Sequence, residues 1–182
     1  MTKIVSNFFI SLDGVVESPH EWHFPYFNDE MSAAMGDAMD KSALLMGRKL
    51  YEEWAAYWPN HTGEDADFAD FLKHVDKYVV SNTLEEASWE NTTIVSGDDI
   101  AKEIRDIKER TQGEIGMSGS ATLVRWLLAE GLLDELNLLV HPIVVGHGQR
   151  LFEDTPTHRL ELTGHEVFST GVLNLTYTPA AD

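Results

Sequence analysis

The chain has 182 residues, 43% of them hydrophobic, and its 31 acidic and 13 basic side chains give a formal charge of −18 at pH 7. This length fits one domain, residues 1–182, with enough apolar side chains for a substantial core. The negative charge argues against nucleic acid as a partner, because a phosphate backbone requires a basic face. The sequence contains no cysteine, which excludes disulfides and thiol chemistry, and no apolar run approaches the roughly 20 residues of a membrane span. Since the N-terminus also lacks a signal-peptide pattern, we expect a cytoplasmic protein.

Short apolar strands alternate with amphipathic helices along the sequence. In chain order we expect a strand at 4–10, a turn at 13–14, an aromatic-rich loop at 18–28, a helix capped by Asn28 and running to about Asp40, a strand at 44–46, and helices at 47–58 and 65–74. The second half is expected to contain strands at 77–81 and 92–95, a helix from Asp98 or Asp99 to Arg110, a strand at 114–117, a helix at 119–130, a strand at 136–145, and a hairpin of 160–168 and 172–178. This alternation predicts an α/β protein whose mostly parallel sheet is covered on both faces and ends in an antiparallel hairpin.

Small, polar or basic residues directly follow four of the predicted strands. These clusters are Gly47-Arg48, Ser81-Asn82-Thr83, Ser96-Gly97 and Ser118-Gly119-Ser120. The ligand crevice of such a sheet lies beyond the carboxyl ends of its strands, so the four clusters are expected at one edge. Gly47 has no Cβ to keep a ligand away, the next helix begins with free N–H groups that favour an anion, and Arg48 adds a fork of donors that suits phosphate. The pattern therefore predicts a nucleotide site.

Several short motifs follow one another in a specific order from Ile4 to about Tyr177. They are Ile10-Ser11-Leu12-Asp13-Gly14, Met46-Gly47-Arg48, Val80-Ser81-Asn82, Ser118-Gly119-Ser120-Ala121-Thr122-Leu123, the segment 131–136, the segment 141–148, and Leu151-Phe152. In this order they resemble the dihydrofolate reductase-like superfamily, and more closely the branch related to the C-terminal reductase domain of bifunctional riboflavin-biosynthesis deaminase-reductases. The resemblance implies a three-layer α/β/α fold, NADPH as the cofactor, and a homodimer formed through the 136–145 strand region.

The resemblance also assigns roles at the cofactor. Cofactor contacts are implied for Gly47, Arg48, Lys49, Ser81, Asn82, Thr83, Ser118, Gly119, Ser120, Ala121 and Thr122. Arg48 would meet the 2′-phosphate that distinguishes NADP from NAD, and Lys49 would lie near the pyrophosphate. A cis peptide bond, often found at the family's glycine pair, would fall on one side of Gly119.

The chain departs from the pattern of the family at three positions. Leu50 stands where the family often has threonine, Ser118 where the riboflavin-pathway reductases have an acidic residue, and Trp54 near the place of an aspartate. A polar pyrimidine would need such partners, because an unpaired buried polar group costs about 1–3 kcal/mol. These departures argue against the riboflavin intermediate as the substrate.

Candidate residues for the substrate side lie in the aromatic loop and at the start of the helix that follows it. Asp29 is the best candidate for a proton-side group, with a favourable helix-dipole position as the alternative. Asp13 either caps its own tight turn or acts directly, since the family places this loop beside the nicotinamide. Trp22, Tyr26 and Trp54 either line a pocket for a flat substrate or pack in the core. His141 and His147 lack nearby carboxylates at ligand spacing, so we expect no metal site.

These features lead to three functional hypotheses. The first is an NADPH-dependent reductase that transfers a hydride to a small, flat, conjugated molecule, which could be pterin-, pyrimidine- or quinone-like. The second is an NADP(H)-binding sensor or interaction protein without turnover. The third is a true dihydrofolate reductase. The residues do not identify the substrate.

Overall fold

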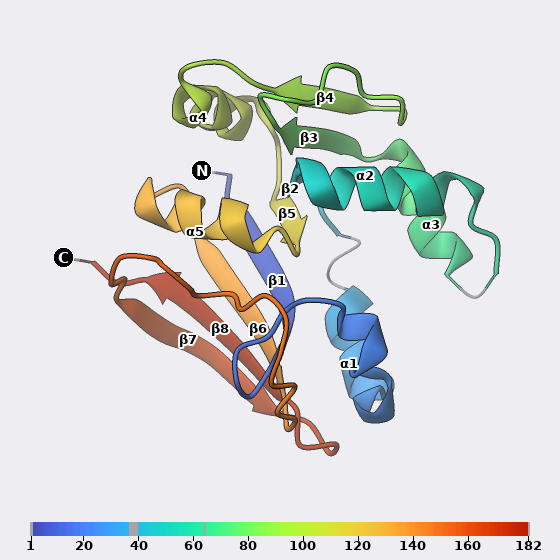
Figure 1. Cartoon of the computed structure of the whole chain (residues 1–182), viewed down its shortest axis with the longest axis vertical. Coiled ribbons are helices and arrows are strands. Elements are labelled where there is room, and N and C mark those ends of the chain that lie inside the picture. Colours follow the sequence, from blue (N-terminus) through green and yellow to red (C-terminus); the bar gives the residue numbers. More distant parts are fainter. Residues whose placement is uncertain (1, 37–39, 64, 182) are drawn as a thin grey trace.

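The computed structural model describes residues 2–36, 40–63 and 65–181, and these form an eight-stranded sheet with the strand order β4-β3-β2-β5-β1-β6-β8-β7 (Figure 1). The strands are β1 (Ile4–Ser11), β2 (Ala43–Gly47), β3 (Asp76–Val80), β4 (Thr92–Val95), β5 (Ile115–Ser118), β6 (Glu135–His141), β7 (Leu160–Val167) and β8 (Leu173–Pro179). Neighbouring strands from β4 to β6 are parallel, whereas β8 pairs antiparallel with both β6 and β7. The predicted parallel sheet with a C-terminal hairpin is confirmed.

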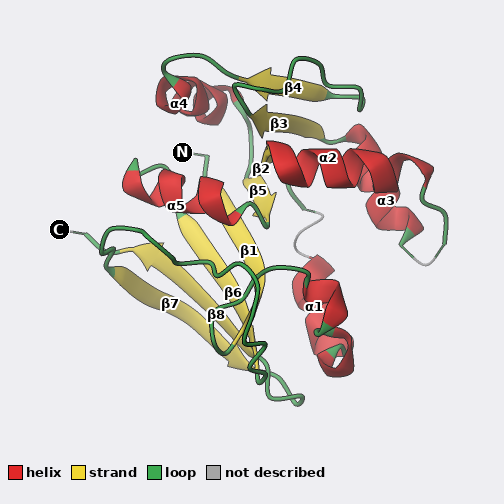
Figure 2. Ribbon diagram, in the orientation of Figure 1, coloured by secondary structure: helices red, strands yellow, loops and turns green. Residues whose placement is uncertain are grey.

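Helices cover the sheet on both faces (Figure 2). They are α1 (Asp29–Gly36), α2 (Arg48–Tyr57), α3 (Ala66–His74), α4 (Ile100–Arg110) and α5 (Ala121–Ala129), together with the short 3-10 helices η1 (Pro19–Glu21), η2 (Phe24–Tyr26) and η4 (Trp58–Asn60). Alternate residues of β2 point to opposite faces: Leu45 packs in the cluster that contains α4 and α5, while Leu44 and Met46 pack with α2 and α3. The predicted three layers are therefore present. In the described ranges, the structure contains no helix both long and apolar enough to cross a membrane.

The expected strand at 136–145 is wrong beyond His141, where β6 ends. The next residue is Pro142, which has no N–H to donate to a sheet. The chain then turns, with the Ile143 N–H donating to the His141 carbonyl at 2.8 Å. This early end leaves residues 142–148 to form a loop beside the Asp13 turn.

Two helix boundaries also differ from the expectation. The helix expected at 119–130 begins at Ala121, because Gly119 and Ser120 both adopt left-handed backbone conformations with φ of 72° and 59°. Asn28 caps α1 as predicted, since its side-chain oxygen accepts from the Met31 N–H at 3.0 Å. The described part of α1 ends at Gly36, residues 37–39 of the expected helix lie outside the described residues, and Asp40 is not helical.

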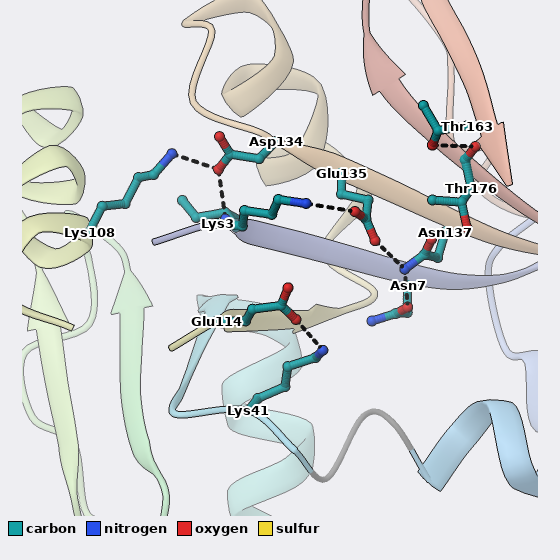
Figure 3. Close-up of polar contacts among 11 residues, drawn as sticks. Lys3, Asn7, Lys41, Lys108, Glu114, Asp134, Glu135, Asn137, Thr163 and Thr176 are labelled. Carbon is teal, nitrogen blue, oxygen red and sulfur yellow. Dashed lines mark hydrogen bonds and ion pairs between the residues drawn. The ribbon is translucent and has the colours of Figure 1, made fainter. Parts of the chain in front are cut away.

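The amino ends of the central strands are joined by polar contacts (Figure 3). Ion pairs link Lys3 with Glu135 at 3.4 Å, Lys41 with Glu114 at 2.6 Å, and Lys108 with Asp134 at 2.6 Å. The Asp134 carboxylate also accepts from the Ile4 N–H at 2.7 Å, and Asn137 donates to Asn7 at 3.1 Å. These contacts tie together the segments that lead into β1, β2, β5 and β6, at the end of the sheet opposite to the predicted ligand edge.

Lys77 on β3 is fully buried, which the sequence pattern did not indicate. Its ammonium group donates to the carbonyl of Leu72, in the last turn of α3, at 2.6 Å and to that of Val75, just past the helix, at 2.8 Å. The same nitrogen lies 4.8 Å from the centre of the Trp89 ring. Burial lowers the pKa of Lys77 from 10.5 to about 8, against the opposing effect of Asp76 and Glu90.

Candidate functional site

The amino-terminal ends of α2 and α5 meet at the predicted ligand edge. The Gly47 N–H, at the end of β2, donates to the Ser120 hydroxyl at 3.0 Å. A Cβ built on Gly119 would lie 3.8 Å from both methyl carbons of Leu50, so the segment after β5 packs directly on α2. Two of the four predicted clusters are thus neighbours, and the unpaired N–H groups of two helix starts lie close together, as an anion requires.

The residues around Gly119 form the turn that leads into α5. Ser118 is the exposed last residue of β5, Ala121 is buried at the helix start, and Thr122 is exposed on the first turn. All peptide bonds in the described ranges are trans, so the expected cis bond beside Gly119 is absent. The turn is instead made by the left-handed conformations of Gly119 and Ser120.

The two basic residues of the first α2 turn are exposed. The Arg48 guanidinium donates to both carboxylate oxygens of Glu52, at 3.0 and 3.1 Å, and the two side chains are 49% and 47% exposed. An exposed pair at this helical spacing contributes only about 0.3–0.5 kcal/mol. A phosphate group could therefore displace Glu52 at little cost, and Lys49 lies exposed beside Arg48.

The cluster after β3 is engaged in local hydrogen bonds. The Ser81 hydroxyl accepts from the N–H groups of Thr83 and Leu84, at 3.1 and 3.0 Å, and closes a tight turn. The Asn82 side-chain oxygen accepts from the Gly97 N–H at 2.8 Å. This bond brings the clusters after β3 and β4 together, so all four predicted clusters lie along one edge, in two contacting pairs.

Asp13 holds the neighbouring loop in place. Its carboxylate accepts from the Ser11 hydroxyl at 2.6 Å and from the N–H groups of Val145 and Gly146 at 3.0 and 2.8 Å. These hydrogen bonds, led by that from Ser11, lower the pKa of Asp13 to about 2. Because these hydrogen bonds occupy both oxygens of the carboxylate, they favour the structural role of Asp13 over a direct one.

Asp29 is exposed at the first turn of α1, where it faces water. The adjacent Glu30 makes the polar contacts of this helix: its carboxylate accepts from the N–H and hydroxyl of Ser169, at 2.8 and 2.6 Å, and from Asn28 at 2.6 Å. These hydrogen bonds, led by that of the Ser169 hydroxyl, lower the pKa of Glu30. Glu30 therefore attaches α1 to the turn between β7 and β8.

Of the three aromatic residues predicted to line a substrate pocket, the structure brings two together. Trp22 and Tyr26 both pack edge-on against His141, with ring centres 5.2 and 5.7 Å away. Trp54 packs elsewhere, against Trp58 and Phe68 in the cluster between α2 and α3. Trp54 therefore packs in the core and does not line a pocket together with Trp22 and Tyr26.

His141 lies at the centre of a cluster, which we call the aromatic cluster, that also contains the buried Trp22 and His23 and the partly buried Phe9 and Tyr26. The ring centres of Phe9 and His23 lie 5.7 and 6.2 Å from that of His141. Burial lowers the pKa values of both histidines, which favours the neutral form of each ring. From the sequence, His141 was considered only as a possible metal ligand. The signal for its place at the end of a strand was Pro142, the residue that follows it.

The strand order relates the aromatic cluster to the helix starts. Phe9 and His141 lie near the carboxyl ends of β1 and β6, and β1 is hydrogen-bonded to β5, from which the Gly119 turn leaves. The edge therefore carries phosphate-type donors at β2 and β5 and a group of flat rings at β1 and β6. This layout fits an extended ligand with an anionic part and a planar part.

Comparison with known proteins identifies the fold as dihydrofolate reductase-like. Dihydrofolate reductase from Enterococcus faecalis, complexed with NADP(H), aligns over 98% of this chain and 97% of its own with a TM-score of 0.67 and 13% identity. A candidate riboflavin biosynthesis protein from Shewanella sp. PV-4 aligns over the whole of both chains with a TM-score of 0.76 and 20% identity. At these identities the two structures establish the fold and leave the activity open.

The family is established by sequence. The model of the RibD C-terminal domain matches residues 2–174, and the chain belongs to this family. The uncharacterized protein YyaP of Bacillus subtilis strain 168 is 29% identical over 184 residues, which cover 96% of this chain and 94% of YyaP. The resemblance inferred from the short motifs is confirmed.

Proposed function

We propose that this protein is an NADPH-dependent reductase of a small, flat, conjugated molecule. The observation that carries the proposal is the junction of Gly47 with Ser120, where two helix starts meet beside Arg48. Membership of the RibD C-terminal domain family and the NADP(H) complex of a protein with the same fold support the choice of cofactor. When bound, the nicotinamide supplies the hydride.

The residues of the edge fit a dinucleotide phosphate. Gly47 keeps the approach to the α2 start free of a side chain, and the first-turn N–H groups of α2 and α5 would hold the pyrophosphate together with Lys49. Arg48 would release Glu52 and bind the 2′-phosphate. The planar reacting end would then lie toward β1 and the aromatic cluster, whose rings exclude water and orient a flat substrate.

The site contains few groups that could supply the proton for the reaction. Asp13 is ionised and bound to the loop of Val145 and Gly146, which assigns it to positioning that loop. Asp29 remains our proposed proton-side group, at the solvent-exposed start of α1. The engagement of Asp13 favours a second candidate function, an NADP(H)-binding sensor without turnover.

One assay separates the reductase from the sensor. The oxidation of NADPH is followed by absorbance while the protein is offered dihydrofolate, pterins, pyrimidines and quinones in turn. We expect saturable oxidation with at least one of these classes. Cofactor binding without oxidation of NADPH by any of them would favour the sensor, and strong turnover of dihydrofolate with antifolate inhibition would indicate a true dihydrofolate reductase.

Replacing Gly47 with alanine should weaken NADPH binding without harming the fold. Gly47 has φ of −82° and ψ of 164°, which any residue adopts, and an added Cβ would lie 3.6 Å from the Ser120 hydroxyl, an ordinary contact. The methyl group would occupy space at the phosphate-binding turn, so we expect an increase in Kd of about tenfold or more. Calorimetry measures the affinity, and thermal unfolding serves as the check on the fold.

The matched control is the change Gly119→Ala, because Gly119 has φ of 72° and an alanine there is strained. This variant should lose both stability and affinity, whereas Gly47→Ala should lose affinity alone. Unchanged NADPH affinity in Gly47→Ala would remove Gly47 from the proposed site.

A further inference from the structure

We propose that His141 is a specificity-determining residue, whose Nε2 atom accepts a hydrogen bond from an N–H group at the edge of the substrate ring. The inference rests on the proposed reductase function and narrows its substrate class. A planar heterocycle with a ring N–H would be selected, and an oxidised quinone, which has no such donor, would not.

The tautomer of His141 follows from one hydrogen bond. Its Nδ1 atom lies 2.8 Å from the Leu139 carbonyl oxygen, which can only accept. Nδ1 therefore carries the proton of the neutral ring, and Nε2 presents a lone pair. His141 is consequently fixed as a hydrogen-bond acceptor.

The Nε2 lone pair is left without a partner among the described residues. The whole side chain is fully buried, and the rings packed against the imidazole belong to Phe9, Trp22, His23 and Tyr26. The Nδ1 atom of His23 is likewise buried and unbonded within the part of the chain that the structure describes. Buried polar groups in folded proteins are usually paired, so two unsatisfied nitrogens in one cluster indicate a missing partner.

The missing partner has to be flat and has to carry a donor. The surrounding rings offer stacking and edge contacts to a planar molecule, and they leave few polar atoms to compete for its donor. The position lies beside the β5–β1 part of the edge, where the reacting ring of the proposed cofactor would end. A substrate that donates an N–H to Nε2 would therefore be held edge-on at the hydride-transfer end of the site.

The aromatic loop, residues 18–28, provides the route by which a ligand would reach His141. Trp22 and His23 lie between η1 and η2, Tyr26 is the last residue of η2, and Tyr26 is the most exposed of the three. A long hydrogen bond, at 3.4 Å, from the Tyr26 hydroxyl to the carbonyl of Pro142 joins this loop to the residue that directly follows β6. A ligand that displaces the Tyr26 ring would reach Nε2 without breaking the sheet.

Matched ligand pairs and three variants test the proposal. The probes are uracil and lumazine, which carry ring N–H groups, and their 1,3-dimethyl derivatives, which have the same rings without those donors. Binding to the full chain is measured by tryptophan fluorescence, once without cofactor and once in the presence of NADP⁺. The wild type should bind at least one N–H ring about tenfold more tightly than its dimethyl derivative, the value of one hydrogen bond to a buried acceptor.

His141→Phe keeps a ring of similar size and removes the acceptor, so the preference should disappear. His141→Gln places an amide oxygen near the position of Nε2 and should restore part of the preference. The control is His147→Phe, because His147 makes the same type of bond to the carbonyl two residues earlier, at 3.0 Å, but is exposed. That variant should keep the wild-type preference.

Nitrogen NMR of the wild type gives a readout that does not depend on any variant. The Nε2 resonance of His141 should move on addition of the N–H ring and stay in place with its dimethyl derivative. Equal binding of both members of each pair, binding of neither ring, or an unchanged preference in His141→Phe would overturn the proposal. If NADPH fails to bind the wild type, the reductase function falls separately, because the ring preference is measured on its own.

Discussion

Raising the pH from about 8 to 10.5 should stabilise the wild-type protein relative to a Lys77→Met variant, by up to roughly 3 kcal/mol in the free energy of unfolding. Lys77 is fully buried, and its ammonium group contacts two carbonyls and the Trp89 ring. Burial of the charge is the largest influence on its pKa, which falls from 10.5 to about 8. The charged form is therefore disfavoured in the folded protein.

The direction of the pH effect follows from proton binding. Below pH 8 both the folded and the unfolded chain carry the proton, and the folded protein bears the full penalty of the buried charge. Between pH 8 and 10.5 the folded chain has released the proton and the unfolded chain has kept it, so the folded state gains stability as the pH rises. Methionine has a similar length and no charge, so it lacks this contribution.

Urea unfolding of both proteins at several pH values measures the difference. The control is Lys73→Met, which removes an exposed ammonium group close by on α3. A difference between the wild type and Lys77→Met that does not change with pH would show that the ammonium group is not destabilised in the folded protein.

Arg48→Ala should weaken NADPH binding by roughly tenfold to a hundredfold and leave NADH binding nearly unchanged. A hydrogen bond to a charged group contributes about 1.5–3 kcal/mol, and the two cofactors differ only in the 2′-phosphate that we assign to Arg48. The stability of the fold should change little, because Arg48 is half exposed and its pair with Glu52 is a surface contact. Calorimetric titration of both cofactors gives the two affinities.

The matched variant is Glu52→Gln. It removes the carboxylate that competes with phosphate for Arg48 and leaves a side chain of the same size. We expect NADPH to bind this variant at least as tightly as the wild type, with NADH again unaffected. Equal losses for NADPH and NADH in Arg48→Ala would place Arg48 outside the 2′-phosphate site.

The fold could be predicted from periodicity because strands and helices each have their own spacing of apolar residues. The predicted boundaries were wrong where single residues ended a strand or delayed the start of a helix. Pro142 stopped β6 after His141, and the left-handed turn at Gly119 and Ser120 delayed α5 by two residues. Such ends depend on single residues and on the contacts of the chain beyond them, which a repeating pattern does not contain.

The ligand edge was predictable in part, for a different reason. Clusters that directly follow parallel strands must meet at one edge, and Gly47, Ser120, Asn82 and Gly97 did so. Whether a polar side chain there is free to bind a ligand depends on contacts that the sequence does not show. Asp13 and Ser81 already accept hydrogen bonds from backbone N–H groups. The buried position of Lys77 was hidden for the same reason, because its partners are carbonyls at the end of α3.

The most direct test of the proposed function is a calorimetric titration of the wild-type protein with NADPH and, separately, with NADH. The converging starts of α2 and α5 together with Arg48 predict one NADPH site per chain and weaker binding of NADH. Tighter binding of NADH, or binding of neither cofactor, would contradict the assignment of this edge to NADPH.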